Sequence, residues 1–257
     1  MNHFLQTAIS AAKNAGEILV EYMGKVTVSE KHPRDLVTEA DLAAQEAIEK
    51  HLLREYPDHR FIGEESLGSI ELTDEYTWIV DPLDGTTNFV HQLRSFSVSI
   101  ALLKNSQPIV GVVYDPICKE CFYAMHENGA FLNDTKISVS MCEQMRLALL
   151  VTGFSPSITK NSIEAHRFLE VLGKAQSIRR LGSAALNLCY LATGRVDGYW
   201  ASGLNAWDIA AGMLILTEAG GKVRGLDGEF DLLKPKFIAS ATNNLGDEIE
   251  RTLNNAE

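Results

Sequence analysis

The spacing of apolar residues predicts two amphipathic helices near the start of the chain. Between residues 4 and 23 apolar side chains recur at helical spacing, and Gly24 follows as a helix stop. The run Thr38-Glu39-Ala40-Asp41 has the capping-box pattern of a second helix start. The apolar residues expected along this second helix are Leu42, Ile48 and Leu52.

Alternation with period two marks the middle of the chain as β-structure. A short apolar strand at residues 78–80 is followed by alternating segments at 98–100, 109–114 and 121–124. These segments are separated by residues typical of turns. Because consecutive short strands of this kind pair with their neighbours in the chain, we expect an antiparallel meander.

Beyond about residue 142 strands and helices alternate, which is typical of α/β structure. The strands are expected at 147–151, 196–200 and 236–241, and the helices at 163–172, 183–192 and 207–219, with a last helix after them. The chain is therefore predicted to be mixed α+β. No Pro-, Gly- or Ser-rich linker separates the halves, so residues 1–141 and 142–257 are predicted to be two subdomains of one integrated unit.

Composition and charge narrow the possible partners. The chain has 257 residues, of which 46% are hydrophobic and 22% charged, as in ordinary folded proteins. Its 23 basic and 34 acidic residues give a formal net charge of −11, the wrong sign for neutralising nucleic-acid phosphates. Nucleic acid is therefore not expected as the main partner. No apolar run approaches the roughly 20 residues that cross a bilayer, and the first residues do not resemble a signal peptide, so a cytoplasmic protein without a membrane partner is expected.

The cysteines suggest one alternative site. Cys118 and Cys121 form a single C-x-x-C, which could belong to a zinc or redox site. However, the pair falls inside an expected β-hairpin, and no second pair supplies the four ligands of a structural zinc. An ordinary turn is the preferred interpretation.

The clearest chemistry lies in residues 81–86, Asp-Pro-Leu-Asp-Gly-Thr. Pro82 is expected to stop strand pairing and to leave the carbonyl of Leu83 free to point inward. Asp81, Asp84 and that carbonyl are hard oxygen ligands, which Mg²⁺ prefers. The segment therefore predicts a metal site at the end of a strand.

An anion site is predicted directly after these acids. Gly85 allows close backbone approach, and Thr86 and Thr87 are predicted to begin a helix whose first N–H groups have no partner within the helix. Asp-Pro and Asp-Gly also occur in ordinary turns, so either dipeptide alone would indicate only a turn. Further acids, Glu64-Glu65 and Asp208, stand near the expected starts of other elements. Their presence favours a functional site over an ordinary turn.

Three segments resemble the signatures of the inositol monophosphatase family, in the same order and at similar spacing. They read Gly63-Glu64-Glu65-Ser66, Asp81-Pro82-Leu83-Asp84-Gly85-Thr86 and Trp207-Asp208-Ile209-Ala210-Ala211-Gly212. The likeness extends to residues 35–41 and to Gly182-Ser183-Ala184-Ala185, so it covers nearly the whole chain.

The resemblance implies a Mg²⁺-dependent phosphate monoester hydrolase that binds two or three ions. By this likeness Glu64, Asp81 and the Leu83 carbonyl would hold a first Mg²⁺, and Asp81, Asp84 and Asp208 a second, with Asp81 bridging. A third, weaker ion would lie near Glu64. The family's fold has αβαβα layers with the site between the subdomains. A homodimer and inhibition by millimolar Li⁺ are also implied.

Further residues receive roles by the same likeness. Thr86 and Asp41 match the pair that polarises the nucleophilic water, although Asp41 could simply cap its helix. The amides of Gly85 and Thr86 would bind phosphate, and Glu65 would orient metal ligands. The remaining candidates for orienting ligands or contacting substrate are Gly182, Ser183 and Ala184.

Some positions depart from the family pattern. Members that act on inositol phosphates commonly carry a Glu where this chain has Ala201, which puts inositol specificity in doubt. Lys31 is a candidate for the family's mobile-loop Lys, but its spacing is about one residue short. Arg179-Arg180 is interpreted as a solvated pair or subunit contact, with recognition of a second anion as the alternative. Thr87-Asn88 differs from the nucleotidase branch of the superfamily.

Several functions therefore stay open at this stage. The substrate could be an inositol phosphate, fructose 1,6-bisphosphate, histidinol phosphate or NADP. A catalytically silent binding or scaffold protein of the same fold is the alternative from another class, but such a protein would be expected to have lost a ligand. None of the expected metal ligands is missing from the sequence.

Overall fold

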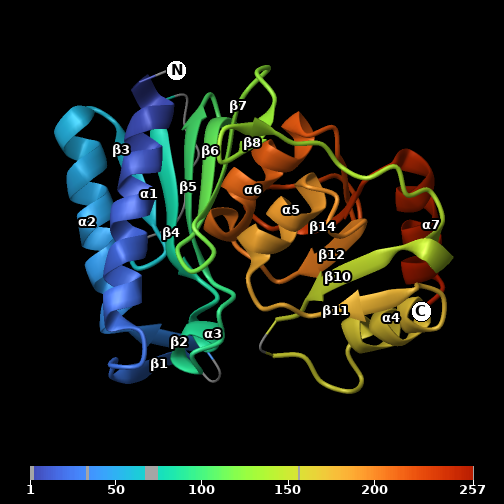
Figure 1. Cartoon of the computed structure of the whole chain (residues 1–257). Helices are drawn as coiled ribbons and strands as arrows, with labels where there is room; N and C mark the ends of the chain where they lie inside the picture. Colours follow the sequence, from blue (N-terminus) through green and yellow to red (C-terminus); the bar gives the residue numbers. More distant parts are fainter. Residues whose placement is uncertain (1–2, 33–34, 67–74, 156, 257) are drawn as a thin grey trace.

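Alternating helices and sheets form five layers (Figure 1). The computed structural model describes residues 3–32, 35–66, 75–155 and 157–256. Helices α1 (His3–Tyr22) and α2 (Glu39–Glu55) form the first layer, and α5 (Ala184–Ala192) and α6 (Ala206–Glu218) the third. Helices α4 (Ile163–Leu172) and α7 (Asn243–Asn254) form the last. The αβαβα order implied by the family resemblance is confirmed.

The second layer is a seven-stranded sheet in the order β3-β4-β5-β6-β7-β8-β9. Its strands are β3 (Arg60–Gly63), β4 (Thr77–Asp84), β5 (Ser97–Lys104), β6 (Gln107–Asp115), β7 (Glu120–Met125), β8 (Ala130–Leu132) and β9 (Thr135–Lys136). The predicted antiparallel meander is confirmed from β4 to β7. Strand β3 was not predicted, and it pairs with β4 in parallel.

The fourth layer is a five-stranded sheet in the order β11-β10-β12-β14-β13. Its strands are β10 (Leu149–Gly153), β11 (Ser177–Arg179), β12 (Gly198–Ser202), β13 (Lys222–Gly225) and β14 (Lys236–Ser240). The predicted strands at 147–151 and 196–200 each begin two residues later, and a 3₁₀ turn, η1 (Met145–Leu147), precedes the first. Strands β10, β11 and β12 are parallel, so their carboxyl ends share one edge.

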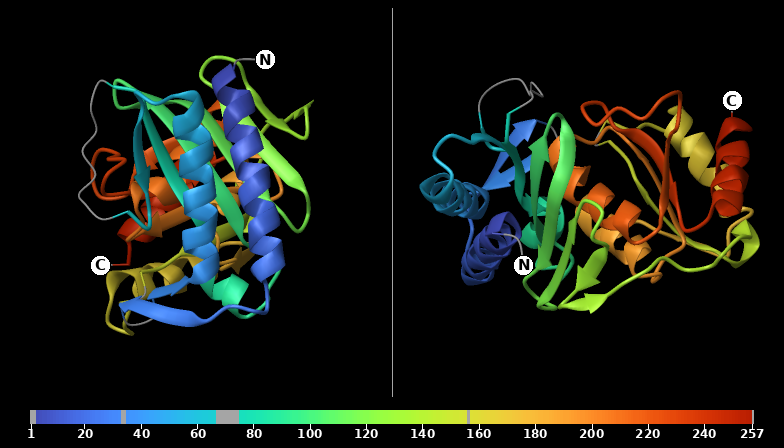
Figure 2. Two further views of the ribbon diagram at one scale, coloured as in Figure 1. Left: turned by 90° about the vertical axis from the view of Figure 1, so that its left-hand side faces the viewer. Right: turned by 90° about the horizontal axis from the view of Figure 1, so that it is seen from above.

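The outer helices α1 and α2 cover one face of the seven-stranded sheet with small apolar residues (Figure 2). Helix α1 buries Ala8, Ala15 and Leu19, and it ends before Gly24, whose φ of 77° suits a left-handed turn. Helix α2 begins at its predicted capping box. Leu42 does not belong to its buried face, because it is 55% exposed and the contacts with the sheet fall to Ala40, Ala44, Ile48 and Leu52.

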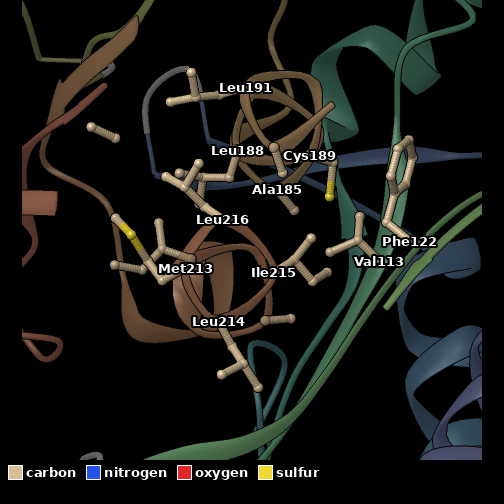
Figure 3. Packing of buried hydrophobic residues seen from close by; sticks show 14 of the residues in the cluster. Val113, Phe122, Ala185, Leu188, Cys189, Leu191, Met213, Leu214, Ile215 and Leu216 are labelled. Atoms are coloured by element: carbon tan, nitrogen blue, oxygen red, sulfur yellow. The ribbon is translucent and has the colours of Figure 1, made fainter. Parts of the chain in front are cut away.

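Helix α6 lies between the two sheets and is apolar on nearly all sides, as expected for a helix without a solvent face. Figure 3 shows Ile215 pointing toward Val113 and Phe122 of the seven-stranded sheet, with α5 packed beside α6. The backbones approach closely, since a Cβ on Gly111 would lie 2.7 Å from the Ala211 carbonyl oxygen. This shared core connects the two halves of the chain.

A small hairpin and a short helix complete the fold near the end of β4. Strands β1 (Val28–His32) and β2 (Asp35–Thr38) pair antiparallel, and helix α3 (Thr86–Val90) contacts β2 (Figure 1). The hairpin was not predicted from the sequence. None of the described helices is long and apolar enough to span a bilayer.

Candidate active site

The end of β4 carries two buried acids in an irregular piece of strand. Asp81 is 2% exposed and Asp84 7%, and the register with β5 shifts between them. Pairing resumes at Asp84, which lies opposite Ser97, so the prediction that Pro82 ends the pairing is wrong. Pro82 lacks an N–H and therefore interrupts the ladder, but the strand continues past it. The Leu83 N–H donates to Asp81 Oδ1 at 2.9 Å, which closes a tight turn around the acid.

Two glycines bring the loop after β4 against the loop before α5. Gly85 has φ of 98° and Gly182 has φ of 90°, a conformation that favours glycine. A Cβ on Gly85 would lie 3.3 Å from the carbonyl oxygen of Gly182, and a Cβ on Gly182 would lie 2.6 Å from Asn88 Nδ2. The Asn88 amide also donates to the Leu181 carbonyl at 2.7 Å. These contacts fix the predicted phosphate-binding turn to the second half of the chain.

Asp84 is held at the N-terminus of α5. Its carboxylate accepts from the N–H groups of Ala184 and Ala185 at 3.0 and 2.8 Å, and from the hydroxyl of Ser183, the N-cap residue. Ser97 donates from the neighbouring strand at 3.3 Å. Ser183 and Ala184 therefore orient an expected metal ligand, one of the two roles that the sequence left open.

Asp41 and Asp208 occupy the same position in two different helices. Each is the third residue of its helix, α2 or α6, and is the last residue of the capping box there. Asp41 Oδ2 accepts from the Thr38 N–H at 2.8 Å, and Asp208 Oδ2 accepts from the Asn205 N–H at 2.7 Å. One carboxylate oxygen thus fixes the helix start in each case, and the other oxygen can serve a different partner.

The Glu64-Glu65 turn follows β3 and is held by α2. The Glu64 N–H donates to the Val80 carbonyl at 3.0 Å, which places Glu64 beside the end of β4. The Glu65 N–H donates to Gln45 Oε1 at 2.9 Å. A Cβ on Gly63 would lie 2.1 Å from that same oxygen, so only glycine leaves room for the Gln45 side chain.

The carboxyl groups of Glu64, Asp81, Asp84 and Asp208 lie close enough to influence one another's ionisation. Burial raises the pKa of Asp81 well above its usual range, and the negative charges of Glu64, Asp84 and Asp208 raise it further. Burial likewise raises the pKa of Asp208 strongly, against the hydrogen bond from Asn205, and Asp84 and Glu64 add to the rise. No cationic side chain is among these leading influences on the pKa values of Asp81 and Asp208.

This donor set fits a hard divalent cation. The grouped ligands are carboxylate oxygens and a backbone carbonyl, which suit Mg²⁺ rather than a soft metal. In the described part of the chain, however, no three Asp, Glu, His or Cys side chains already enclose a metal position. Hydrogen bonds within the protein engage both Asp84 oxygens and one oxygen each of Asp81 and Asp208. The acids are therefore gathered, but a closed set of ligands requires their side chains to change conformation.

Thr86 lies between two predicted functional groups. Its hydroxyl is 3.1 Å from the Leu83 carbonyl oxygen and 3.4 Å from Asp41 Oδ1. Asp41 is 1% exposed, and burial raises the pKa of its carboxyl, with the charge of Glu65 adding to the effect. The two Asp41 oxygens divide the roles that the sequence left as alternatives: Oδ2 caps α2, and Oδ1 faces Thr86.

A pocket of about 150 Å³ opens beside Asp84 and Asp208 at the carboxyl ends of β10 and β12. Open α/β sheets commonly bind ligands at this position. Its other lining residues are Thr152, Gly153, Phe154, Arg180, Gly182, Ser183, Ala184, Asn187, Tyr199 and Leu204. Arg179 and Arg180 are both exposed, but only Arg180 lines this pocket, whereas Arg179 donates to Ser177 and to the Ile178 carbonyl.

Several residues around the site were not found from the sequence. Gln45 follows Asp41 by four positions, so a signal existed: two polar residues on the buried face of one helix. Ser97 and Ser99 gave a similar signal, since both lie on one face of the buried strand β5. Ser99 donates to the Trp207 carbonyl at 3.2 Å, next to Asp208. The side chain of Lys31 lies outside the described part of the chain.

The C-x-x-C pair lies in the β6–β7 hairpin, as expected from the sequence, with Cys118 in the turn and Cys121 on β7. Cys118 is exposed and Cys121 is buried, and both are free thiols. Burial raises the pKa of both groups, that of Cys121 to about 11, which opposes the thiolate that a metal or redox site needs.

Comparison with known proteins places the chain in a family. The profile of the inositol monophosphatase family matches residues 1–257. Inositol monophosphatase 2 of Solanum lycopersicum is 45% identical over 266 aligned positions, which cover 100% of both chains. The protein named Nus factor SuhB of Pasteurella multocida is 42% identical, covering 97% of this chain and 95% of its own. The suhB protein structure from Bartonella henselae has a TM-score of 0.92 at 37% identity, covering 98% of each chain. This chain belongs to the inositol monophosphatase family and is a phosphoric monoester hydrolase.

Proposed function

We propose that this chain hydrolyses a small phosphate monoester in a Mg²⁺-dependent reaction, by in-line attack of water. The observation that carries the proposal is the coupling of Glu64, Asp81, Asp84 and Asp208, which come from three separate parts of the chain. Asp81 and Asp84 are buried and Glu64 and Asp208 are partly exposed, and gathering four like charges in this way is costly unless a cation joins them. A phosphatase of this family has a direct use for such a cation.

The proposed metal ligands are the ones expected from the sequence: Glu64, Asp81, the Leu83 carbonyl, Asp84 and Asp208. They would hold two or three Mg²⁺ ions. When bound, Mg²⁺ would supply charge neutralisation at the phosphate, an acidified water and stabilisation of the leaving oxygen. Asp81 lies between Glu64 and Asp208 in the network of interacting carboxyls, which supports its assignment as the bridging ligand.

Thr86 and Asp41 would move the proton of the attacking water. Thr86 can accept a hydrogen bond from the water while its own proton goes to Asp41 Oδ1, 3.4 Å away. The raised pKa of Asp41 brings its carboxyl closer to working pH, where a general base is most effective. Thr38 keeps Asp41 in place through two hydrogen bonds to Oδ2, of 2.8 and 2.7 Å.

Backbone amides of Gly85 and Thr86 would bind the phosphate oxygens. Helix α3 has only five residues, so its macrodipole contributes little, and the local N–H groups carry the interaction. The contact between Gly85 and the Gly182 carbonyl keeps this turn rigid. No phosphoenzyme is required, because the attacking group is water.

The substrate is proposed to be inositol 1-phosphate or another small phosphomonoester. Ala201 is 1% exposed and packs in the core with Tyr199, so it offers the pocket no acceptor for a polyol hydroxyl. Fructose 1,6-bisphosphate, histidinol phosphate and NADP therefore remain candidate substrates. The gathered acids support catalysis over a silent scaffold role.

Four further properties complete the proposal: the homodimer and the Li⁺ inhibition follow from the family resemblance, and the location and the subdomain division follow from the sequence pattern. We infer a homodimer, a cytoplasmic location and inhibition by millimolar Li⁺. We also infer subdomains at 1–141 and 142–257 that act as one catalytic unit. The first sheet lies within residues 60–136 and the second within 149–240, which supports this division.

The test is release of inorganic phosphate from inositol 1-phosphate and from glycerol 2-phosphate, with Mg²⁺ and with excess chelator. We expect turnover with Mg²⁺ and none with the chelator. The Asp208→Asn variant is the matched control, since it removes one charge at nearly constant volume. Phosphate release that survives the chelator would contradict the proposal.

A further inference from the structure

The pocket beside Asp84 and Asp208 has features that the phosphate chemistry leaves unused. Its walls come from the ends of β10 and β12, from α5 and from the loops around them. A phosphate held at Asp84 would direct its leaving group into this space. The residues that line the far side of the pocket should therefore select the substrate.

Arg180 provides a positive charge in this pocket. Its guanidinium lies over the ring of Phe154, 5.8 Å from the ring centroid, so the side chain has an apolar support. Arg180 is exposed, and like Arg179 it forms no ion pair with a carboxylate within the described part of the chain, whereas Arg167, Arg195 and Arg224 each do. An unpaired guanidinium in a ligand pocket is suited to a planar anion.

The side-chain carbonyl oxygen of Asn187 is a hydrogen-bond acceptor that no donor among the described residues engages. Its side chain is 2% exposed, and Oδ1 has no hydrogen-bond partner among the described residues. The amide is engaged on its other side, where a hydrogen bond from Asn187 acts on the Tyr199 hydroxyl. Buried acceptors are nearly always satisfied, so an unpaired one that lines a pocket points to a donor on the ligand.

The rest of the described pocket lining is apolar or carries hydroxyl groups, from Thr152, Ser183 and Tyr199, and it includes no further acid. Ala201 is buried in the core, and Phe154 and Leu204 line the wall. The only acids among the described lining residues are Asp84 and Asp208, which we assign to the metal. A wholly neutral polyol would leave Arg180 without a partner.

The geometry points to a leaving group that carries a second anionic group, a phosphate or a carboxylate, for Arg180 and a hydroxyl for Asn187. This inference rests on the proposed function, because it concerns the leaving group of the same hydrolysis. It ranks sugar bisphosphates and phosphorylated hydroxy acids above inositol 1-phosphate as substrates of this chain.

The experiment compares kcat/KM for four phosphomonoesters in the presence of Mg²⁺. Fructose 1,6-bisphosphate carries a second phosphate, 2-phosphoglycerate carries a carboxylate, and inositol 1-phosphate and glycerol 2-phosphate carry no second anion. We expect the unmodified enzyme to prefer at least one of the first two by tenfold or more. The two anionic substrates also distinguish a phosphate site from a carboxylate site.

Arg180→Gln is the decisive variant, and Arg179→Gln is its matched control at the adjacent arginine, which does not line the pocket. Loss of a charge-assisted hydrogen bond should lower kcat/KM for the preferred anionic substrate about 10- to 100-fold. Glycerol 2-phosphate should change by less than about twofold, and Arg179→Gln should affect neither substrate. Arg180→Lys should restore part of the loss, because it keeps the charge but not the planar fork.

Binding provides a second readout that does not depend on turnover of the anionic substrate. Fructose 6-phosphate keeps one phosphate and should inhibit glycerol 2-phosphate hydrolysis, with a Ki about tenfold weaker in Arg180→Gln. In Asn187→Leu, kcat/KM should fall severalfold for glycerol 2-phosphate but not for ethyl phosphate, which has no hydroxyl. Melting temperatures identify any variant that fails to fold.

The outcomes separate this inference from the proposed function. If the unmodified enzyme releases no phosphate from any of the four substrates, the proposed function fails. If it hydrolyses them but Arg180→Gln changes all four rates equally, or none, Arg180 does not recognise a second anion and the inference is overturned. The same holds if inositol 1-phosphate is the preferred substrate.

Discussion

The two sheets of this molecule contribute different parts of one site. The seven-stranded sheet ends in the acids of β4 and in the Glu64 turn, and these are held by strand geometry and by α2. The five-stranded sheet contributes the pocket, while α5 and α6 beside it contribute helix N-termini that hold Asp84 and Asp208. The proposed metal ligands thus come from both halves of the chain, whereas the residues proposed to select the leaving group come mainly from the second half.

Helix N-termini help to hold three acids that are buried or partly buried. Asp41, Asp84 and Asp208 each accept a backbone N–H at the start of α2, α5 or α6. The first N–H groups of a helix and its dipole both favour a carboxylate. Each acid is therefore oriented by the fold before any metal binds.

The largest effect is expected from removing one carboxylate of the proposed metal site, to which both halves of the chain contribute. Asp81→Asn and Asp208→Asn should abolish measurable turnover, because each removes a ligand from the proposed Mg²⁺ site at nearly constant shape. The far-ultraviolet circular dichroism spectrum should stay unchanged. A near-normal rate for Asp208→Asn at moderate Mg²⁺ would contradict its assignment.

A smaller loss of activity is expected from interrupting the proposed proton transfer through Thr86 and Asp41, which both belong to the first half of the chain. Thr86→Val should lower kcat by about 10²- to 10⁴-fold with little change in KM, since a general-base pathway of this kind contributes that much. Thr87→Val is the matched control, because Thr87 is the exposed neighbour. An equal effect of both variants would show that the loss comes from the helix start and not from the hydroxyl.

The contact between the halves is probed by Ser183→Ala, which removes a hydroxyl that donates to Asp84. Outer partners of metal ligands typically contribute about 10- to 100-fold to activity or metal affinity. Ser202→Ala removes a hydroxyl that donates to Glu164 on α4 instead, and it should leave activity unchanged. If the two variants behave alike, Ser183 does not orient Asp84.

The smallest effect is a gain in stability. Because the folded protein raises the pKa of Asp208, keeping this carboxyl ionised at neutral pH lowers the free energy of unfolding. Metal-free Asp208→Asn should therefore melt a few degrees higher than the unmodified protein at neutral pH, at roughly 2–4 °C per kcal/mol for a chain of this size. The gain should disappear as the pH falls and the native carboxyl takes up a proton. Scanning calorimetry in chelator would measure it, and a lower melting temperature at neutral pH would oppose the account.

Much of the fold could be predicted because local signals agreed with tertiary structure. The capping box at Thr38 fixed the start of α2, and the alternating strands from β4 to β7 paired as expected. Short strands such as β3 and β11 were missed, because three or four residues carry too little pattern to register. Leu42 was misplaced because its helix uses alanines for its buried face.

The residues of the candidate site could likewise be predicted only in part. The acids were found because hard oxygen ligands near element starts have a chemical meaning that the sequence displays. Asn187 could not be found, since an Asn inside an apolar helix has no distinguishing sequence signal. The roles of Arg179 and Arg180 could not be separated, because only the fold shows that one lines the pocket and the other does not.

The central claim is that acids from both halves of the chain bind Mg²⁺ together, and calorimetric titration of Mg²⁺ into the substrate-free protein tests it most directly. Saturable binding is expected in the unmodified protein, with loss of at least one ion in both Asp81→Asn and Asp208→Asn. Equal Mg²⁺ binding by the unmodified protein and both variants would contradict the account.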